Sequence, residues 1–165
     1  MRLLVAVLPA AALLAACAHP WNAVNLPAGT PRDQVVARAG QPTRVVELPG
    51  GGQRLQYSGQ PFGQYAIMAD LDAGGRLLRA RQVLTEADFN RIELDKWTRA
   101  DIDREFGRPA QVDGVASWNG PIYTYRWQGQ GDMFYWVYFD PQGVVRRAHP
   151  GIEHKNTPDG DRVGR

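Results

Sequence analysis

Residues 35–42 read Val-Val-Ala-Arg-Ala-Gly-Gln-Pro, and residues 102–109 read Ile-Asp-Arg-Glu-Phe-Gly-Arg-Pro, 67 residues further on. In each segment an apolar side chain stands five residues before Gly-x-Pro. This combination ends helices, because glycine accepts the left-handed conformation and proline cannot continue the turn. Two further pairs match in the same order at an offset of 68: Trp21-Asn22-x-Val24-x-Leu26 with Phe89-Asn90-x-Ile92-x-Leu94, and Asp72-Ala73-Gly74-Gly75 with Asp140-Pro141-Gln142-Gly143. The spacing predicts a duplicated unit, with one copy over residues 21–84 and the other over 85–152.

Each copy begins with helix signals and continues with strand signals. Thr30, Thr85 and Thr98 are each followed within three residues by an acid, which predicts helix N-caps, and Pro31 suits the first helical position. After each Gly-x-Pro the apolar pattern changes to alternation, which is typical of strands. The strand-like runs are 43–48, 53–58, 65–71, 76–84, 110–115, 122–128, 133–140 and 144–148. Short connections favour antiparallel hairpins. We therefore expect an α+β fold of two tandem repeats, each with two short helices packed on a three- to four-stranded antiparallel sheet.

The chain starts with a secretion signal. Met1-Arg2 precedes the apolar run Leu3–Ala16, which is shorter than the about 20 residues that a membrane-spanning helix needs. The run closes on Leu14-Ala15-Ala16-Cys17, which looks like a bacterial lipobox, and Cys17 is the only cysteine. Ala18 stands where an aspartate is associated with retention in the inner membrane, so we expect a lipid anchor in the outer membrane, with the domain on the periplasmic face. The segments expected outside the repeats are a cleaved leader (1–16), a lipidated linker (17–20) and a flexible tail (153–165).

Composition argues against nucleic-acid binding and against most catalytic arrangements. Without residues 1–16, 18 Lys and Arg residues stand against 17 Asp and Glu residues, and no basic run is present. Cys17 is assigned to lipid, and the three histidines lack the spacing of metal ligands. We expect no catalytic residues, no metal and no cofactor. A hydrolase that uses Asp70 and Asp72 as acid and base is the enzymatic alternative.

Aromatic residues gather in the second copy, where 11 of the 16 lie from Trp97 onward. Residues 133–139 are apolar on both faces of a strand, although an antiparallel sheet normally turns one face to water. Two interpretations stay open: the second face packs against the first repeat, or part of it binds a protein, since Tyr and Trp dominate interface energetics. The candidate contact residues are Trp127, Tyr135, Trp136 and Tyr138, with Tyr57 and Tyr65 as first-copy analogues.

The first copy carries a short motif of a known family. Gly29-Thr30, Val35, Gly40-x-Pro42 and a strand ending in Leu55-Gln56-Tyr57 resemble the SmpA/OmlA (BamE-like) lipoproteins. The resemblance implies an outer-membrane lipoprotein that acts by protein–protein contacts, as an accessory or scaffold in the assembly of outer-membrane β-barrel proteins or in envelope integrity. The duplicated unit is also similar to the β-lactamase inhibitor protein arrangement, in which two αα-β repeats form a concave, aromatic-lined binding face. That likeness leaves an alternative function, a periplasmic inhibitor or sequestering protein that binds an envelope enzyme.

Overall fold

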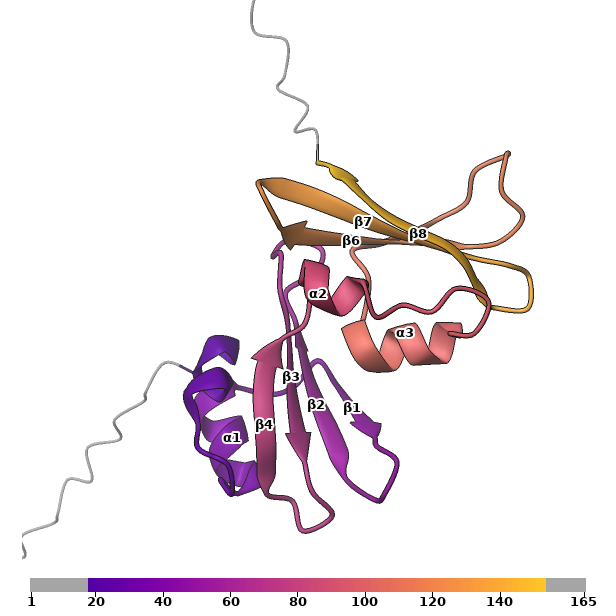
Figure 1. The fold of residues 1–165 in the computed structure, drawn as a ribbon. Coiled ribbons are helices and arrows are strands. Elements are labelled where there is room, and N and C mark those ends of the chain that lie inside the picture. The colour runs from indigo at the N-terminus through magenta and orange to yellow at the C-terminus, as the bar shows by residue number, and fades with distance from the viewer. Residues whose placement is uncertain (1–17, 154–165) are drawn as a thin grey trace, which may run out of the picture.

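The computed structural model describes residues 18–153, and within them the chain forms two units of the same α+β architecture (Figure 1). The first unit contains the 3-10 helix η1 (Pro20–Asn25), α1 (Arg32–Ala39), β1 (Arg44–Glu47), β2 (Gln53–Ser58), β3 (Ala66–Leu71) and β4 (Leu77–Gln82). The second contains α2 (Glu86–Phe89), α3 (Arg99–Phe106), β5 (Gln111–Asp113), β6 (Ile122–Gln128), β7 (Asp132–Phe139) and β8 (Val145–Ile152). Each unit has one antiparallel four-stranded sheet with its strands in chain order. The predicted fold class is confirmed.

The two sheets share one strand register. Leu55 lies opposite Ala69 in the first sheet, and Tyr123 lies opposite Val137 in the second, so both partners shift by 68 residues. The irregularity near the end of β3 recurs near the end of β7. The aspartate that opens the turn before β4 accepts two backbone N–H groups through its side chain, and so does its counterpart before β8. The duplication therefore extends from the sequence to the hydrogen-bonding pattern.

The helix starts agree with the sequence in the second unit and differ in the first. Thr98 forms a full capping box with Asp101, and Thr85 accepts from the Asp88 N–H. Thr30 does not cap α1, because its hydroxyl donates to the Pro27 carbonyl at 2.7 Å. Pro31 takes the N-cap position with extended backbone and no side-chain cap, so α1 begins one residue later than predicted.

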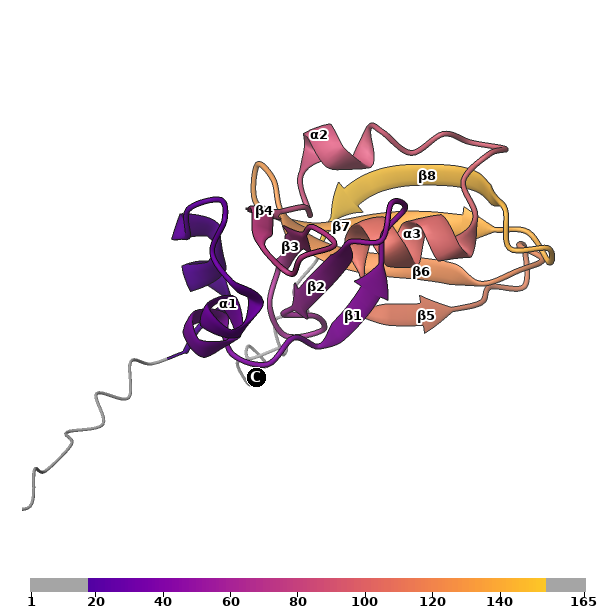
Figure 2. The same ribbon diagram turned by 90° about the horizontal axis from the view of Figure 1, so that it is seen from below.

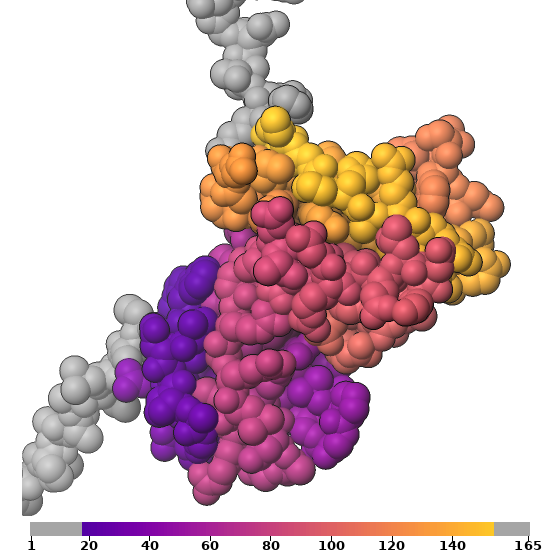
Figure 3. All heavy atoms as spheres, viewed as in Figure 1, coloured from indigo at the N-terminus to yellow at the C-terminus, as the bar shows by residue number. Residues whose placement is uncertain are grey.

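The elements stack in four layers. The first sheet has η1 and α1 on one face and α2 and α3 on the other, and the second sheet lies beyond α2 and α3 (Figures 1 and 2). Figure 3 shows the same order with all atoms, α2 and α3 lying between the two sheets. One core lies between η1, α1 and the first sheet, and a second joins α2, α3 and residues of both sheets. The helices of the second repeat are thus buried on two sides.

The last strand runs further than the alternation predicted. β8 continues through Pro150 to Ile152, and the Glu153 N–H donates to the Asp132 carbonyl at 3.0 Å. Glu153 also pairs with Arg126 at 2.7 Å, so it belongs to the fold and not to the predicted tail. Cys17, the leader and residues 154–165 lie outside the described residues. Within residues 18–153, no helix is long and apolar enough to cross a membrane.

Candidate protein-binding face

Each sheet has a second face, turned away from the helices of its own repeat. On the first sheet we call it the inter-repeat face, made by Arg54, Gln56, Ser58, Ala66, Met68, Asp70, Arg79, Arg81 and Val83. On the second sheet we call it the outer face, made by Ile122, Thr124, Arg126, Phe134, Trp136, Tyr138, Arg147, His149 and Gly151. The two lists correspond position by position at the shift of 68 residues. They are equivalent surfaces with different chemistry.

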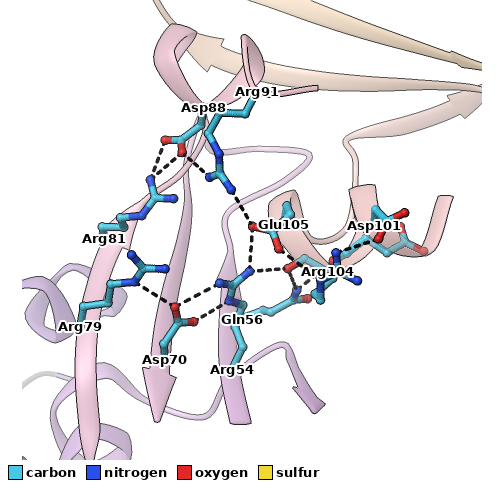
Figure 4. A network of polar contacts seen from close by, with 11 residues as sticks. Arg54, Gln56, Asp70, Arg79, Arg81, Asp88, Arg91, Asp101, Arg104 and Glu105 are labelled. Carbon is cyan, nitrogen blue, oxygen red and sulfur yellow. Dashed lines mark hydrogen bonds and ion pairs between the residues drawn. The ribbon is translucent and has the colours of Figure 1, made fainter. Parts of the chain in front are cut away.

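The inter-repeat face is mostly polar, apart from Ala66, Met68 and Val83, and the C-terminal end of α3 lies on its polar part. Arg54 and Asp70, each 5% exposed, form a two-point ion pair at 2.5 and 3.1 Å. Arg54 also donates to the Arg104 carbonyl at 3.0 Å, and Gln56 donates to the carbonyls of Asp103 and Arg104 at 2.9 and 3.1 Å (Figure 4). The last carbonyls of a helix lack partners within the helix and carry its negative dipole end. The first sheet therefore supplies the groups that the end of α3 requires.

A second ion cluster fixes α2 to the same face. Arg81 donates to both oxygens of Asp88 at 2.7 Å, and Arg91 reaches Asp88 at 3.2 Å and Glu105 at 3.7 Å (Figure 4). Burial alone would raise the pKa of Asp88, but the bonds from Arg81, Thr85 and Arg91 outweigh it, and the pKa is lowered. The carboxylate of Asp88 stays ionised, as the pairing requires.

The two aspartates of the enzymatic alternative are occupied elsewhere. Burial opposes ionisation of Asp70, but the pairs with Arg54 and Arg79 dominate and lower its pKa. Asp72 accepts from the N–H groups of Gly74 and Arg76 in the turn after β3. A buried carboxylate held ionised by two arginines is a poor proton donor, so the geometry does not support the acid–base pair.

The outer face is aromatic, and no helix or strand of the described residues lies on it (Figure 1). The Trp136 ring contacts Phe134 and His149, with centroids 5.6 and 5.3 Å apart. Tyr138 stacks on His149 at 5.5 Å and meets Trp118 edge-on at 5.3 Å. Ile122 and Thr124 lie buried in this face. The aromatic side chains are half-buried, and they lie over the strands of this face.

Small features hold this layer in place. The Trp118 indole N–H donates to the Phe139 carbonyl at 2.8 Å, which pins loop 114–121 against Tyr138. A Cβ at Gly151 would overlap the Trp136 ring, so the missing side chain lets the indole lie against β8. The aromatic groups are ordered by the fold before any partner arrives, which reduces the entropy lost on binding.

A loop of the first repeat extends the outer face at one end. Phe62 is 92% exposed, which is unusual for a large apolar side chain. Its loop is clamped to β6, since Arg126 donates to the carbonyls of Pro61 and Phe62 at 2.8 and 3.2 Å. Gln60 donates to the Arg126 carbonyl at 2.7 Å and accepts from its N–H at 3.1 Å. Phe62 was not among the predicted contact residues, because the sequence of residues 59–63 indicates only a turn. An aromatic residue at a Gly- and Pro-rich turn was the available signal.

The candidate residues separate by strand alternation. Trp136 and Tyr138 lie half-buried on the outer face. Trp127 and Tyr135 point to the other side of the sheet, where both pack on Phe89 of α2, so the expectation that they are surface contacts is wrong. The strand geometry fixes this, because successive residues along one strand face opposite sides of the sheet, so Tyr135 and Trp136 cannot share a face.

The first-copy analogues also lie away from the inter-repeat face. Tyr57 is buried between the first sheet and α1, and its hydroxyl has no hydrogen-bond partner within residues 18–153. Tyr65 is half-buried and contacts Trp21 at 5.8 Å. Tyr57 is therefore a core residue, contrary to the prediction. The interpretation that the second sheet packs its outer face on the first repeat is also wrong, since α2 and α3 make that contact from its opposite side.

Comparison with known proteins gives little beyond this geometry. No family model and no curated protein matches the chain. Among residues 18–153 no group of three or more His, Cys, Asp or Glu side chains is placed to hold a metal ion. Among solved structures, a crystal structure of a DUF4309 family protein (YjgB) from Bacillus subtilis subsp. subtilis str. 168 is similar, with a TM-score of 0.33 and 15% sequence identity. The alignment covers 74% of this chain and 78% of that chain.

Proposed function

We propose that this chain is a lipid-anchored envelope protein that binds a helix of a partner protein on the outer face of its second sheet. The observation that carries the proposal is the register equivalence of the two faces. The inter-repeat face holds two helices, and the outer face presents the same nine positions without a covering element among the described residues. A partner helix would occupy the place that α2 and α3 have on the first sheet.

The chemistry of the outer face supports a protein partner. Trp136, Tyr138 and Trp118 are the residue types that most often dominate binding energy, and they lie together in a fixed arrangement. Arg147 lies over the Tyr138 ring at 5.1 Å and adds a positive charge beside the aromatic layer. An aromatic centre with a charged edge matches the usual composition of a protein interface.

A lipid anchor on Cys17 would hold the outer face close to the membrane. Lipid on Cys17 would concentrate the domain at the membrane and raise the effective concentration of the face toward a membrane-bound partner. The Cys17→Ser substitution should release the protein from membrane fractions without changing its melting temperature. Membrane association that survives this substitution contradicts the anchor.

Crosslinking tests the binding face directly. A photoreactive phenylalanine analogue at position 136 should form an intermolecular adduct in cells, whereas the same group at position 68, its equivalent on the inter-repeat face, should react only within the chain. The adducts would be identified by mass spectrometry, and the crosslinked peptide of the partner should lie on a helix. A folded protein that gives no intermolecular adduct from position 136 contradicts the proposal.

The same experiment separates the two functions that the sequence left open. Subunits of the β-barrel assembly machinery in the adduct support an accessory role. A single envelope enzyme, inhibited by the purified domain in proportion to its concentration, supports an inhibitor. The outer face fits either partner, because the proposed occupant is a helix, whichever protein carries it.

A further inference from the structure

A pocket opens on the opposite side of the second sheet, between the start of α2 and the hairpin that joins β6 to β7. Its volume is about 800 Å³, within the range of small-molecule sites. Its apolar lining includes Trp127, Met133, Tyr135 and Ile152. Trp127 and Tyr135 are thus core residues whose small exposed surface lines this pocket.

Tyr135 leaves a polar group without a partner in this pocket. The residue is 7% exposed, and its ring stacks on Phe89 with centroids 4.0 Å apart. The neighbouring Trp127 indole N–H is satisfied by the Phe134 carbonyl at 3.2 Å. The Tyr135 hydroxyl has no hydrogen-bond partner among the described residues, and burial raises its pKa. The hydroxyl is not sealed inside the core, so a ligand in the pocket can form a hydrogen bond with it.

The described residues that line the pocket carry acidic charge only. Glu86, Asp132 and Glu153 lie in the wall, and no lysine, arginine or histidine joins them. Arg126 pairs with Glu153 from the outer side, at 2.7 Å, and Asp132 has polar partners that include the Gln64 amide at 3.1 Å. Glu86 is exposed. Aromatic faces with nearby carboxylates attract cations, since ring quadrupoles and negative charges act in the same direction.

We propose that this pocket binds a small organic cation, an ammonium or guanidinium group on an apolar body. The apolar part would lie on Trp127 and Met133, and the cationic group would meet the Tyr135 hydroxyl oxygen and the Glu86 carboxylate. The site is separate from the outer face, and the inference does not depend on the proposed function.

The test compares two probes with the same apolar body. The 2-phenylethylammonium ion carries a positive charge, and 2-phenylethanol is its neutral counterpart. Each is titrated into the full mature chain with Cys17→Ser, and backbone amide shifts of Gly129 and Gly131 are followed by NMR. We expect the cation to bind about tenfold more tightly than the alcohol. Equal affinities, or no shifts at these two glycines with either probe, would overturn the inference.

Two variants test which residues bind the cation, and a third variant is the control. Glu86→Gln and Tyr135→Phe should each weaken cation binding by about threefold and leave the alcohol unchanged, because each removes one polar contact. Glu47→Gln removes an exposed charge on β1, away from the pocket, and should leave both affinities unchanged. A loss of affinity in Glu47→Gln equal to that in Glu86→Gln would show a nonspecific charge effect and overturn the site.

Discussion

The inter-repeat face and the outer face occupy equivalent positions in the two repeats but differ in residue type and in the contacts that they make. The inter-repeat face has Arg54, Gln56 and Asp70 where the outer face has Ile122, Thr124 and Tyr138. Arg54 and Gln56 donate to backbone carbonyls at the end of α3, and Asp70 holds Arg54 in place by an ion pair. On the outer face, Tyr138 contacts the rings of Trp118 and His149, and Ile122 and Thr124 lie buried beside it. A duplicated sheet can therefore use one copy of a surface for folding and leave the other for binding.

The largest loss of stability is expected when the buried arginine of the inter-repeat face is removed. Arg54→Ala should lower the free energy of unfolding by about 3–5 kcal/mol, because Asp70 and Glu105 would lose a buried partner. Urea denaturation followed by circular dichroism measures it.

The matched control is Arg79→Ala, which removes a partner of the same Asp70. The Arg79 side chain is 63% exposed, so we expect a loss of about 1 kcal/mol or less. Similar losses for the two variants would mean that burial does not govern this network.

Equivalent positions on the two faces should respond differently to truncation. Met68→Ala should cost about 3 kcal/mol of stability, since Met68 is buried in the core between the repeats. Trp136→Ala, 68 residues on, should cost about 1 kcal/mol and reduce partner binding. A larger loss of stability for Trp136→Ala than for Met68→Ala would show that the outer face belongs to the core.

Acid should weaken the contact between repeats. The pKa values of Asp70 and Asp88 are lowered in the folded state, so their stabilisation is present above the unfolded pKa of about 3.9 and is lost as the pH falls through the folded values. We expect the free energy of unfolding to fall below about pH 4. The Asp88→Asn variant should show a shallower fall, and Asp33→Asn, an exposed aspartate on α1, should follow the parent protein. An unchanged slope in Asp88→Asn contradicts this assignment.

The smallest effect on stability is expected in the loop that extends the outer face. Phe62→Ala should change the free energy of unfolding by less than about 0.5 kcal/mol, because the side chain touches little of its own protein. The same variant should reduce the yield of intermolecular crosslinks from position 136. Leu78→Ala, an exposed apolar position on β4, should change neither quantity. Unaltered crosslinking in Phe62→Ala would restrict the binding face to the second sheet.

Part of the candidate site could be predicted from the sequence. Trp136 and Tyr138 were predicted as contact residues together with Trp127 and Tyr135, since all four lie in aromatic strands. Alternation divides them into two sides of the sheet, and Phe89 of α2 buries the pair on one side. Phe62 could not be found in this way, because its exposure depends on a clamp between residues 66 positions apart in the chain.

The sequence by itself determined the duplication, the glycines that end α1 and α3, most strand positions and the alternation of side chains along them. These features depend on local backbone preferences and on the spacing of residue types, and both can be read directly from the sequence. Only the tertiary structure decided which faces are covered. A period of two assigns each side chain to a face, but a helix elsewhere in the chain decides whether that face meets protein or water. In the first repeat that face is covered by α2 and α3 of the second repeat, and for the second repeat residues 18–153 contain no equivalent.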